Sequence, residues 1–241
     1  MRDVLKSELL RSVSGLALLG VGSFVILIPA LILTVGPPLD GLREVDDGTA
    51  TRIVFGLIAS SGIVAMYLGS YSVSREFYYR SMSRTIVIGS LRRVFLAKMV
   101  SSALASVALA ITGAAVWAAI SAGVLSAYGR VLQPDVAFWS VAAGSAFASA
   151  CGALIGTSLG WIVQNYYAVS AVVLLIPTMI ELPLLFSAPQ VERFFPVGAF
   201  AGVTGAPIEG LLPWWASGIV LLGWVALATA LAAVVTRRRA K

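Results

Sequence analysis

The stretch SREFYYRSMSRTIVIGSLRRVFLAK, residues 74–98, lies between two strongly apolar segments of a 241-residue chain. It holds six Arg and Lys residues and a single acid, Glu76. A cationic stretch beside apolar segments is typical of the cytoplasmic side of a membrane protein. The stretch therefore orients the chain, and its length and pattern make it a candidate surface for contact with a soluble protein. Its cations are Arg75, Arg80, Arg84, Arg92, Arg93 and Lys98.

The composition excludes several classes of protein. Only 12% of the residues are charged, about half the fraction of a soluble domain, so the bulk of the chain must face lipid or other helices. The net charge is +6, but the basic residues lie beside apolar segments and do not form a patch on a polar domain, so we expect no nucleic-acid partner. The chain has no histidine, which removes His-based catalysis and imidazole metal ligation, and its lone Cys151 supports neither a disulfide nor a metal site. We expect no enzyme and no metal site.

Six apolar segments are each long enough to cross a membrane as a helix of about 20 residues. They lack the two-residue alternation of barrel strands, so we expect an all-α membrane protein, with residues 1–241 forming one six-span domain. The first segment is longer than the apolar core of a signal peptide, and we expect it to be retained and to stop at the Gly-Pro-Pro of residues 36–38. The six segments are 13–35, 53–73, 99–127, 138–163, 168–187 and 214–235.

The charges divide unequally between the two sides of such a six-span protein. With the amino terminus inside, the cytoplasmic side holds the Arg and Lys residues before the first span, those of 74–98, and those after the last span. Only Arg43, Arg52, Arg130 and Arg193 fall outside, together with most of the acids. Arg and Lys prefer the cytoplasmic side, so we predict that both termini are cytoplasmic.

Two features are expected near the outer side. Residues 188–213 are apolar but contain four prolines, so we predict a broken re-entrant segment that dips into the outer interface or packs over the end of the bundle. Glu181 lies in the fifth segment between Pro177 and Pro183, which disfavour a straight helix. An acid at membrane depth faces a bundle interior or a wet cavity. Glu181 is therefore predicted either on a translocation path or just below the outer interface, satisfied by Arg193 or by backbone donors.

Small residues recur at every fourth position of the fourth segment, and a similar stripe of Ser and Ala runs along the third. In lipid, such stripes let helix backbones approach closely. Two interpretations stay open: a tight packing seam within one subunit, or a smooth surface along which two subunits move. The stripe of the fourth segment comprises Gly144, Ala148, Gly152, Gly156 and Gly160.

Within residues 74–98, Glu76, Arg80 and Arg84 are spaced as one polar stripe of a helix, in the order that favours Glu–Arg pairing. We therefore predict an amphipathic helix along the cytoplasmic interface, ended by Gly89-Ser90. The alternative is a basic loop that only orients the chain. The apolar face of the predicted helix would comprise Phe77, Tyr78, Met82, Thr85 and Ile86.

The order of these features resembles the permease subunits of type-2 ABC exporters. In that family a Glu-x-x-x-Gly-Thr segment follows the second span, and a Pro-x-Arg-Arg-like turn and a terminal Ala-Lys precede the third. This chain has Arg80 for Gly, Ser81 for Thr, and no proline before the basic pair. With the six-span layout and the terminal Arg cluster, the resemblance covers nearly the whole chain. The matching positions are Glu76, Arg80-Ser81, Leu91-Arg92-Arg93 and Ala97-Lys98.

The resemblance implies a half-transporter of the plasma membrane. Two permease subunits, identical or different, would form the translocation path and bind two copies of a separate ABC ATPase subunit. A coupling helix between the second and third spans would sit on the ATPase. The chain has no Gly-x-x-x-x-Gly-Lys-[Ser/Thr] sequence, so it would hold no cofactor, and ATP and Mg would bind the partner. The expected ATPase contacts are Glu76, Phe77, Arg80, Ser81, Arg84, Arg92 and Arg93.

The cargo is predicted to be lipophilic or amphipathic, such as a drug, a peptide or a lipid-linked molecule, because the apolar segments have few fixed charges. Export is implied by the resemblance alone. Two other classes stay open. A non-transporting assembly or sensor protein would need no ATPase partner. An intramembrane enzyme would need a nucleophile with a base, or a metal cluster, at membrane depth, where Cys151 and Glu181 are the available groups.

Overall fold

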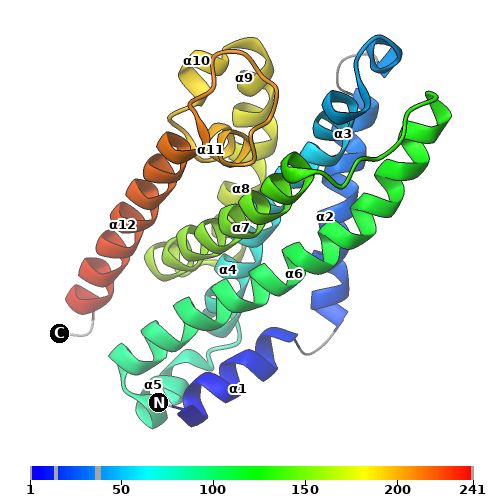
Figure 1. The fold of residues 1–241 in the computed structure, drawn as a ribbon. Coiled ribbons are helices and arrows are strands. Elements are labelled where there is room, and N and C mark those ends of the chain that lie inside the picture. The colour runs from blue at the N-terminus through cyan, green and yellow to red at the C-terminus, as the bar shows by residue number, and fades with distance from the viewer. Residues whose placement is uncertain (1, 14–15, 36–38, 240–241) are drawn as a thin grey trace.

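The structure is a computed structural model that describes residues 2–13, 16–35 and 39–239. Within these ranges the chain is mostly helical and has no β-strand, as the sequence pattern predicted. The helices form an elongated bundle, in which α1 (Arg2–Val13) lies across one end (Figure 1).

Five helical rods in the described part of the chain are long and apolar enough to cross a membrane, as expected of a multi-pass membrane protein. They contain five of the six predicted segments. The rods are α3 (Asp47–Phe55) joined through the 3₁₀ turn η2 (Gly56–Ser60) to α4 (Ser61–Tyr78); α6 (Leu91–Ala127); α7 (Val136–Val163); α8 (Tyr166–Leu175) joined through η3 (Ile176–Glu181) to α9 (Leu182–Ser187); and α12 (Trp214–Arg239).

The first predicted segment corresponds to α2 (Leu16–Val35). The apolar part of this helix whose side chains are described, Gly20–Thr34, is shorter than a span. The stop predicted at residues 36–38 lies outside the described residues. A short 3₁₀ turn, η1 (Leu39–Arg43), then leads towards α3.

Local signals in the sequence explain where several helices begin and end. Asp46, Asp135 and Asn165 each accept a hydrogen bond from the backbone N–H three residues on, at 2.8–3.0 Å, and so cap α3, α7 and α8. Pro183 has no N–H to continue the α-helical pattern, and the turn before it widens into the π-helix η3, in which Leu182 N–H donates to the Pro177 carbonyl. The departure from a regular helix predicted at this pair of prolines is therefore a π-helical turn.

The rod containing α4 lies at the centre of the bundle, and 83% of its most apolar stretch is buried. Its main neighbour is α7, and the small-residue stripe of α7 faces it. A methyl group on Gly152 would meet the Gly62 carbonyl, one on Gly156 the Met66 carbonyl, and one on Gly160 the Ser70 carbonyl. These glycines therefore allow two backbones within one chain to touch. Gly144 lies further along the same stripe, against the backbone of Val203.

The peripheral rods expose large apolar side chains. Only 17% of the most apolar stretch of α12 is buried, and Ile219, Leu222 and Leu227 are each more than half exposed. Met179 and Ile180 of η3 are also exposed. Contiguous apolar faces of this size are unsuited to water and suited to lipid.

Residues 188–213 form two short helices, α10 (Pro189–Glu192) and α11 (Pro196–Val203), and a loop. Residues 196–202 of α11 are all buried, and the helix packs against α12 and α7. Of the two arrangements predicted for this segment, the structure has the one that packs over the end of the bundle.

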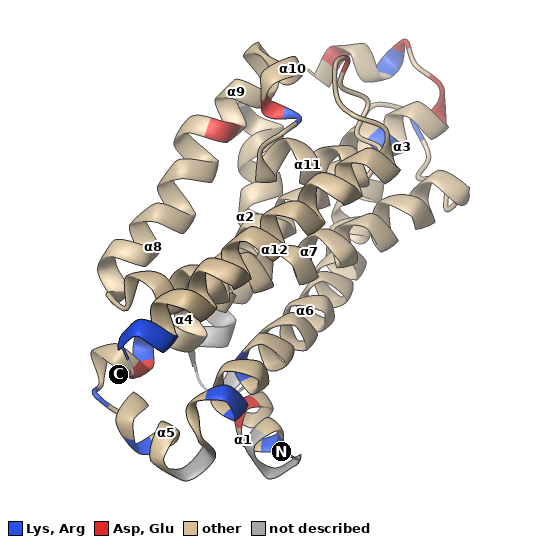
Figure 2. Ribbon diagram, turned by 90° about the vertical axis from the view of Figure 1, so that its left-hand side faces the viewer, with Lys and Arg blue, Asp and Glu red and all other residues tan. Residues whose placement is uncertain are grey.

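Both described ends of the chain lie at the same end of the bundle as α5 (Met82–Gly89), and α3, α10 and α11 lie at the opposite end (Figure 1). Lys and Arg gather at the end with α1 and α5, whereas most acids lie at the other (Figure 2). We call these the basic end and the acidic end.

The continuous amphipathic helix predicted over residues 76–86 is wrong. α4 ends at Tyr78, and Arg80 adopts a left-handed conformation with φ of 55°. Arg80 N–H donates to the Phe77 carbonyl and Ser81 N–H to the Glu76 carbonyl, the pattern of a Schellman cap. The chain turns there, and α5 begins separately. The break predicted at Gly89-Ser90 is present, because α5 ends at Gly89.

Candidate functional site

Four charged side chains meet at the basic end of the bundle, and we call them the ionic cluster: Glu8 and Arg11 of α1, Glu76 of α4 and Lys98 of α6. Lys98 Nζ lies 2.8 Å from Glu8 Oε2 and 2.6 Å from Glu76 Oε1. Arg11 Nη1 lies 3.2 Å from Glu8 Oε1 and 3.4 Å from Glu76 Oε1. Two cations and two acids therefore join three helices that are distant in the sequence.

The ammonium group of Lys98 is fully buried. Besides the two carboxylates, it donates to the Ser72 carbonyl at 3.1 Å, so each of its three hydrogens has an acceptor. Burying an unpaired ammonium is very unfavourable, and burial is tolerated only with such complete pairing. The cluster therefore requires α1, α4 and α6 to keep their relative positions.

The cluster also holds α5. Thr85 Oγ1 donates to Glu76 Oε2 at 3.0 Å, so the carboxylate of Glu76 binds Lys98 through one oxygen and α5 through the other. Met82 of α5 is buried in an apolar group with Val73, Val94 and Trp161. One polar and one apolar attachment thus fix α5 to the ends of α4 and α6.

The predicted ATPase-contact residues divide into two groups. Glu76 is only 5% exposed and belongs to the ionic cluster, so the stripe in which it would pair with Arg80 and Arg84 does not form. Phe77 packs edge-on against Trp161, with ring centroids 5.9 Å apart, and Ser81 is half-buried. The exposed group comprises Arg80, Arg84, Arg92 and Arg93.

Sequence reasoning missed the ionic cluster. Lys98 was predicted only as part of the Ala97-Lys98 motif, and no partner was predicted for Glu8. A usable signal was present, because Glu8 and Glu76 are acids on the side that holds most of the cations. An acid there beside an apolar helix needs a cation from another helix.

Glu181 lies near the acidic end and is 7% exposed. Its Oε2 accepts from Val197 N–H at 2.9 Å, at the start of α11, which is a backbone donor of the kind predicted. Arg193 instead lies over the ring of Phe194, 4.8 Å from its centroid. The place of Glu181 on a translocation path stays a prediction.

Glu192 of α10 accompanies Glu181 and is fully buried. Its Oε1 accepts from Gly198 N–H at 3.3 Å, so both acids bind the first turn of α11. Burial raises the pKa of Glu192 to about 8, and the nearby charge of Glu181 adds to the effect. Glu192 therefore favours its protonated form at neutral pH, which lets two acids share one buried place.

Within the described ranges, no group of three or more Cys, Asp and Glu side chains could hold a metal ion. The ionic cluster has a mainly buried core of Lys98, Glu8 and Glu76, it joins α1, α4 and α6, and through Thr85 it also holds α5.

The chain matches no protein-family model and no curated protein sequence. The resemblance to exporter permeases therefore stays a prediction from the sequence, based mainly on residues 74–98.

Proposed function

We propose that this protein is the membrane permease subunit of an ATP-driven ABC exporter. In this proposal two permease subunits form the translocation path, and two separate ATPase subunits bind ATP and Mg. The cargo is lipophilic or amphipathic. The observation that supports the proposal is α5, a short surface helix attached to the ends of two long apolar helices by the ionic cluster and by Met82.

Such an attachment would transmit movement. A partner that displaces α5 would displace Glu76 and Lys98 with it, because Thr85 binds Glu76, Met82 is buried against α4 and α6, and the Glu76–Lys98 pair is itself buried and costly to break. α4 and α6 would follow as rigid helices. A change between two packings of a bundle can then be selected by contacts made at one end.

The proposal includes six spans, with α2 as the first, in the plasma membrane. The basic end faces the cytoplasm, where the ATPase is found, and both termini lie there. The excess of Arg and Lys at that end supports this orientation. The exposed residues Arg80, Arg84, Arg92 and Arg93 form the contact surface.

Photocrosslinking from two exposed positions tests the proposal. We expect a photoreactive amino acid at position 84 to capture a nucleotide-binding ATPase in the native cells, as identified by mass spectrometry. The same amino acid at Val131, which is 67% exposed at the acidic end, is the matched control and should capture none. Capture of other proteins alone at position 84, or of nothing, would favour a non-transporting assembly or sensor protein.

A charge reversal tests the contact itself. Arg84→Glu should reduce the amount of ATPase that co-purifies with the tagged chain, while Arg43→Glu, at an exposed cation of the acidic end, should not. Glu76→Arg is not an equivalent test, because position 76 is buried and this change disrupts the ionic cluster. Equal co-purification of the ATPase with Arg84→Glu and with the unaltered chain would contradict the proposed contact.

A further inference from the structure

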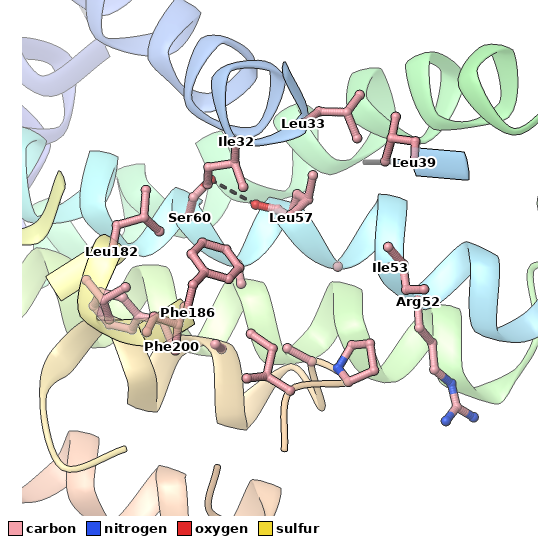
Figure 3. A pocket seen from close by; sticks show the side chains of 18 of the residues that line it. Ile32, Leu33, Leu39, Arg52, Ile53, Leu57, Ser60, Leu182, Phe186 and Phe200 are labelled. Carbon is pink, nitrogen blue, oxygen red and sulfur yellow. Dashed lines mark hydrogen bonds between the residues drawn. The ribbon is translucent and has the colours of Figure 1, made fainter. Parts of the chain in front are cut away.

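A cavity of about 500 Å³ lies between α2, α3, η2, α9 and α11, towards the acidic end (Figure 3). Its walls are almost entirely hydrocarbon. Side chains of α2 and η1 form one wall, and Phe186 and Phe200 close one end (Figure 3). Its apolar lining includes Ile32, Leu39, Leu57, Leu182, Phe186 and Phe200.

Among the described residues that line this cavity, two have polar side chains, and they differ in what they offer a ligand. The hydroxyl of Ser60 donates to the Leu57 carbonyl at 2.8 Å and so is already satisfied. Arg52 lies at the end opposite Phe186 and Phe200 and is exposed (Figure 3). The cavity thus has hydrocarbon along its length and a cation at one end.

The charge of Arg52 is available for binding. Among the described residues it forms no ion pair. The nearest acids in the sequence are engaged elsewhere: Asp46 caps α3 through Thr49, and Asp47 lies 3.6 Å from Arg130. A guanidinium at the mouth of an apolar cavity fits a carboxylate or a phosphate.

We infer that this cavity binds a single-chain anionic amphiphile, with the alkyl chain between α2, α9 and α11 and the headgroup on Arg52. The volume is within the range of cavities that enclose small ligands, and it suits one alkyl chain better than two. Filling a dry apolar cavity with hydrocarbon is favourable, and the surrounding membrane supplies alkyl chains. This binding is independent of transport and would persist in a chain with no ATPase partner.

A photoreactive fatty acid tests the site. The purified protein in lipid nanodiscs is labelled with a long-chain fatty acid that carries a diazirine near the end of its chain, and labelled residues are mapped by mass spectrometry. We expect labelling of the cavity lining, competed away by unlabelled oleate. The matching diazirine alcohol, which has no charge, should label the lining about tenfold less, the difference expected for one charge-assisted hydrogen bond.

Two variants and a control separate the parts of the inference. Arg52→Gln should weaken labelling by the fatty acid about tenfold, while Arg43→Gln should leave it unchanged. Ala201→Phe places a ring in the cavity and should abolish labelling. If that variant does not fold, the oleate competition and Arg52→Gln still decide, because Arg52 is exposed and not needed for packing. Labelling confined to the outer faces of α8 and α12, or equal labelling by acid and alcohol, would overturn the inference.

Discussion

The ammonium group of Lys98 has no access to solvent, and its three hydrogens are shared among Glu8, Glu76 and the Ser72 carbonyl. Each carboxylate is buried because the ammonium is there. The charged side chains therefore behave as a unit, because removing one of them leaves an opposite charge buried without its partner.

We predict that Lys98→Met destabilises the protein strongly. Two carboxylates would remain buried with one cation fewer, a loss of about 3–5 kcal/mol for a broken buried pair. The measurement is the thermal unfolding midpoint in detergent. Arg92→Gln, at an exposed cation of the same helix, is the control and should change the midpoint little. Equal midpoints for the two variants would show that the cluster adds nothing to stability.

Glu192 gives a prediction about pH. Its pKa in the folded protein is about 8 against an ordinary value of 4.5, so folding favours the protonated carboxyl. The stability tied to this proton is fully present below about pH 4.5 and is lost as the pH rises towards 8. Glu192→Gln, which is neutral at every pH, should match the unaltered protein at pH 5 and have a higher unfolding midpoint at pH 8.5. The exposed Glu209→Gln should show no such divergence.

Among the helices, the contact between α4 and α7 depends on glycines. A methyl group at Gly156 would overlap the Met66 carbonyl, whereas one at Gly123 of α6 would meet nothing within 4 Å. Gly156→Ala should therefore lose about 1–3 kcal/mol through overpacking. Gly123→Ala should gain about 0.5–1 kcal/mol through helix propensity. The measurement is the thermal unfolding midpoint of both variants. An unchanged midpoint for Gly156→Ala would mean that the two helices do not touch there.

The turn between α4 and α5 gives a second paired test. Arg80 has a left-handed backbone, which glycine adopts without strain, so Arg80→Gly should stabilise by up to about 1 kcal/mol. Arg84 lies inside α5, and Arg84→Gly should destabilise by about 1 kcal/mol. Both variants remove one exposed arginine, so charge is matched. Opposite changes in the unfolding midpoint support the turn, and equal losses would support the continuous helix.

The helical elements follow from the sequence, and the contacts between them do not. Five rods coincide with predicted segments because length and apolarity are properties of a continuous stretch. The predicted stripe of Glu76, Arg80 and Arg84 was wrong because it assumed one continuous helix. Arginine is not a residue type that indicates a left-handed turn, so the break at Arg80 could not be predicted. Lys98 joins Glu76, 22 residues away, and Glu8, 90 residues away, and a sequence does not show which distant charges pair.

At the scale of the whole molecule, the two ends differ in charge, and the proposed orientation can be tested directly. In a Cys151→Ala background, a cysteine at Val131 should react with a membrane-impermeant maleimide in intact cells. A cysteine at Arg84 should react only after the membrane is opened. Both positions are exposed, so accessibility is matched. Reaction of Arg84→Cys in intact cells would show that the orientation is the reverse of the proposed one and would remove the basis for an ATPase contact at this end.

The ionic cluster also sets an order of events during synthesis. The chain is made from its amino terminus, so Glu8 and Glu76 emerge before Lys98 exists. Until α6 has been made, neither acid has its ammonium, and α1 can meet α4 through the Arg11–Glu76 pair and the Arg75 bond to the Arg11 carbonyl. The ionic cluster is therefore completed only when Lys98 has been made, after both of its acids, and we expect α1 to reach its final position at that stage.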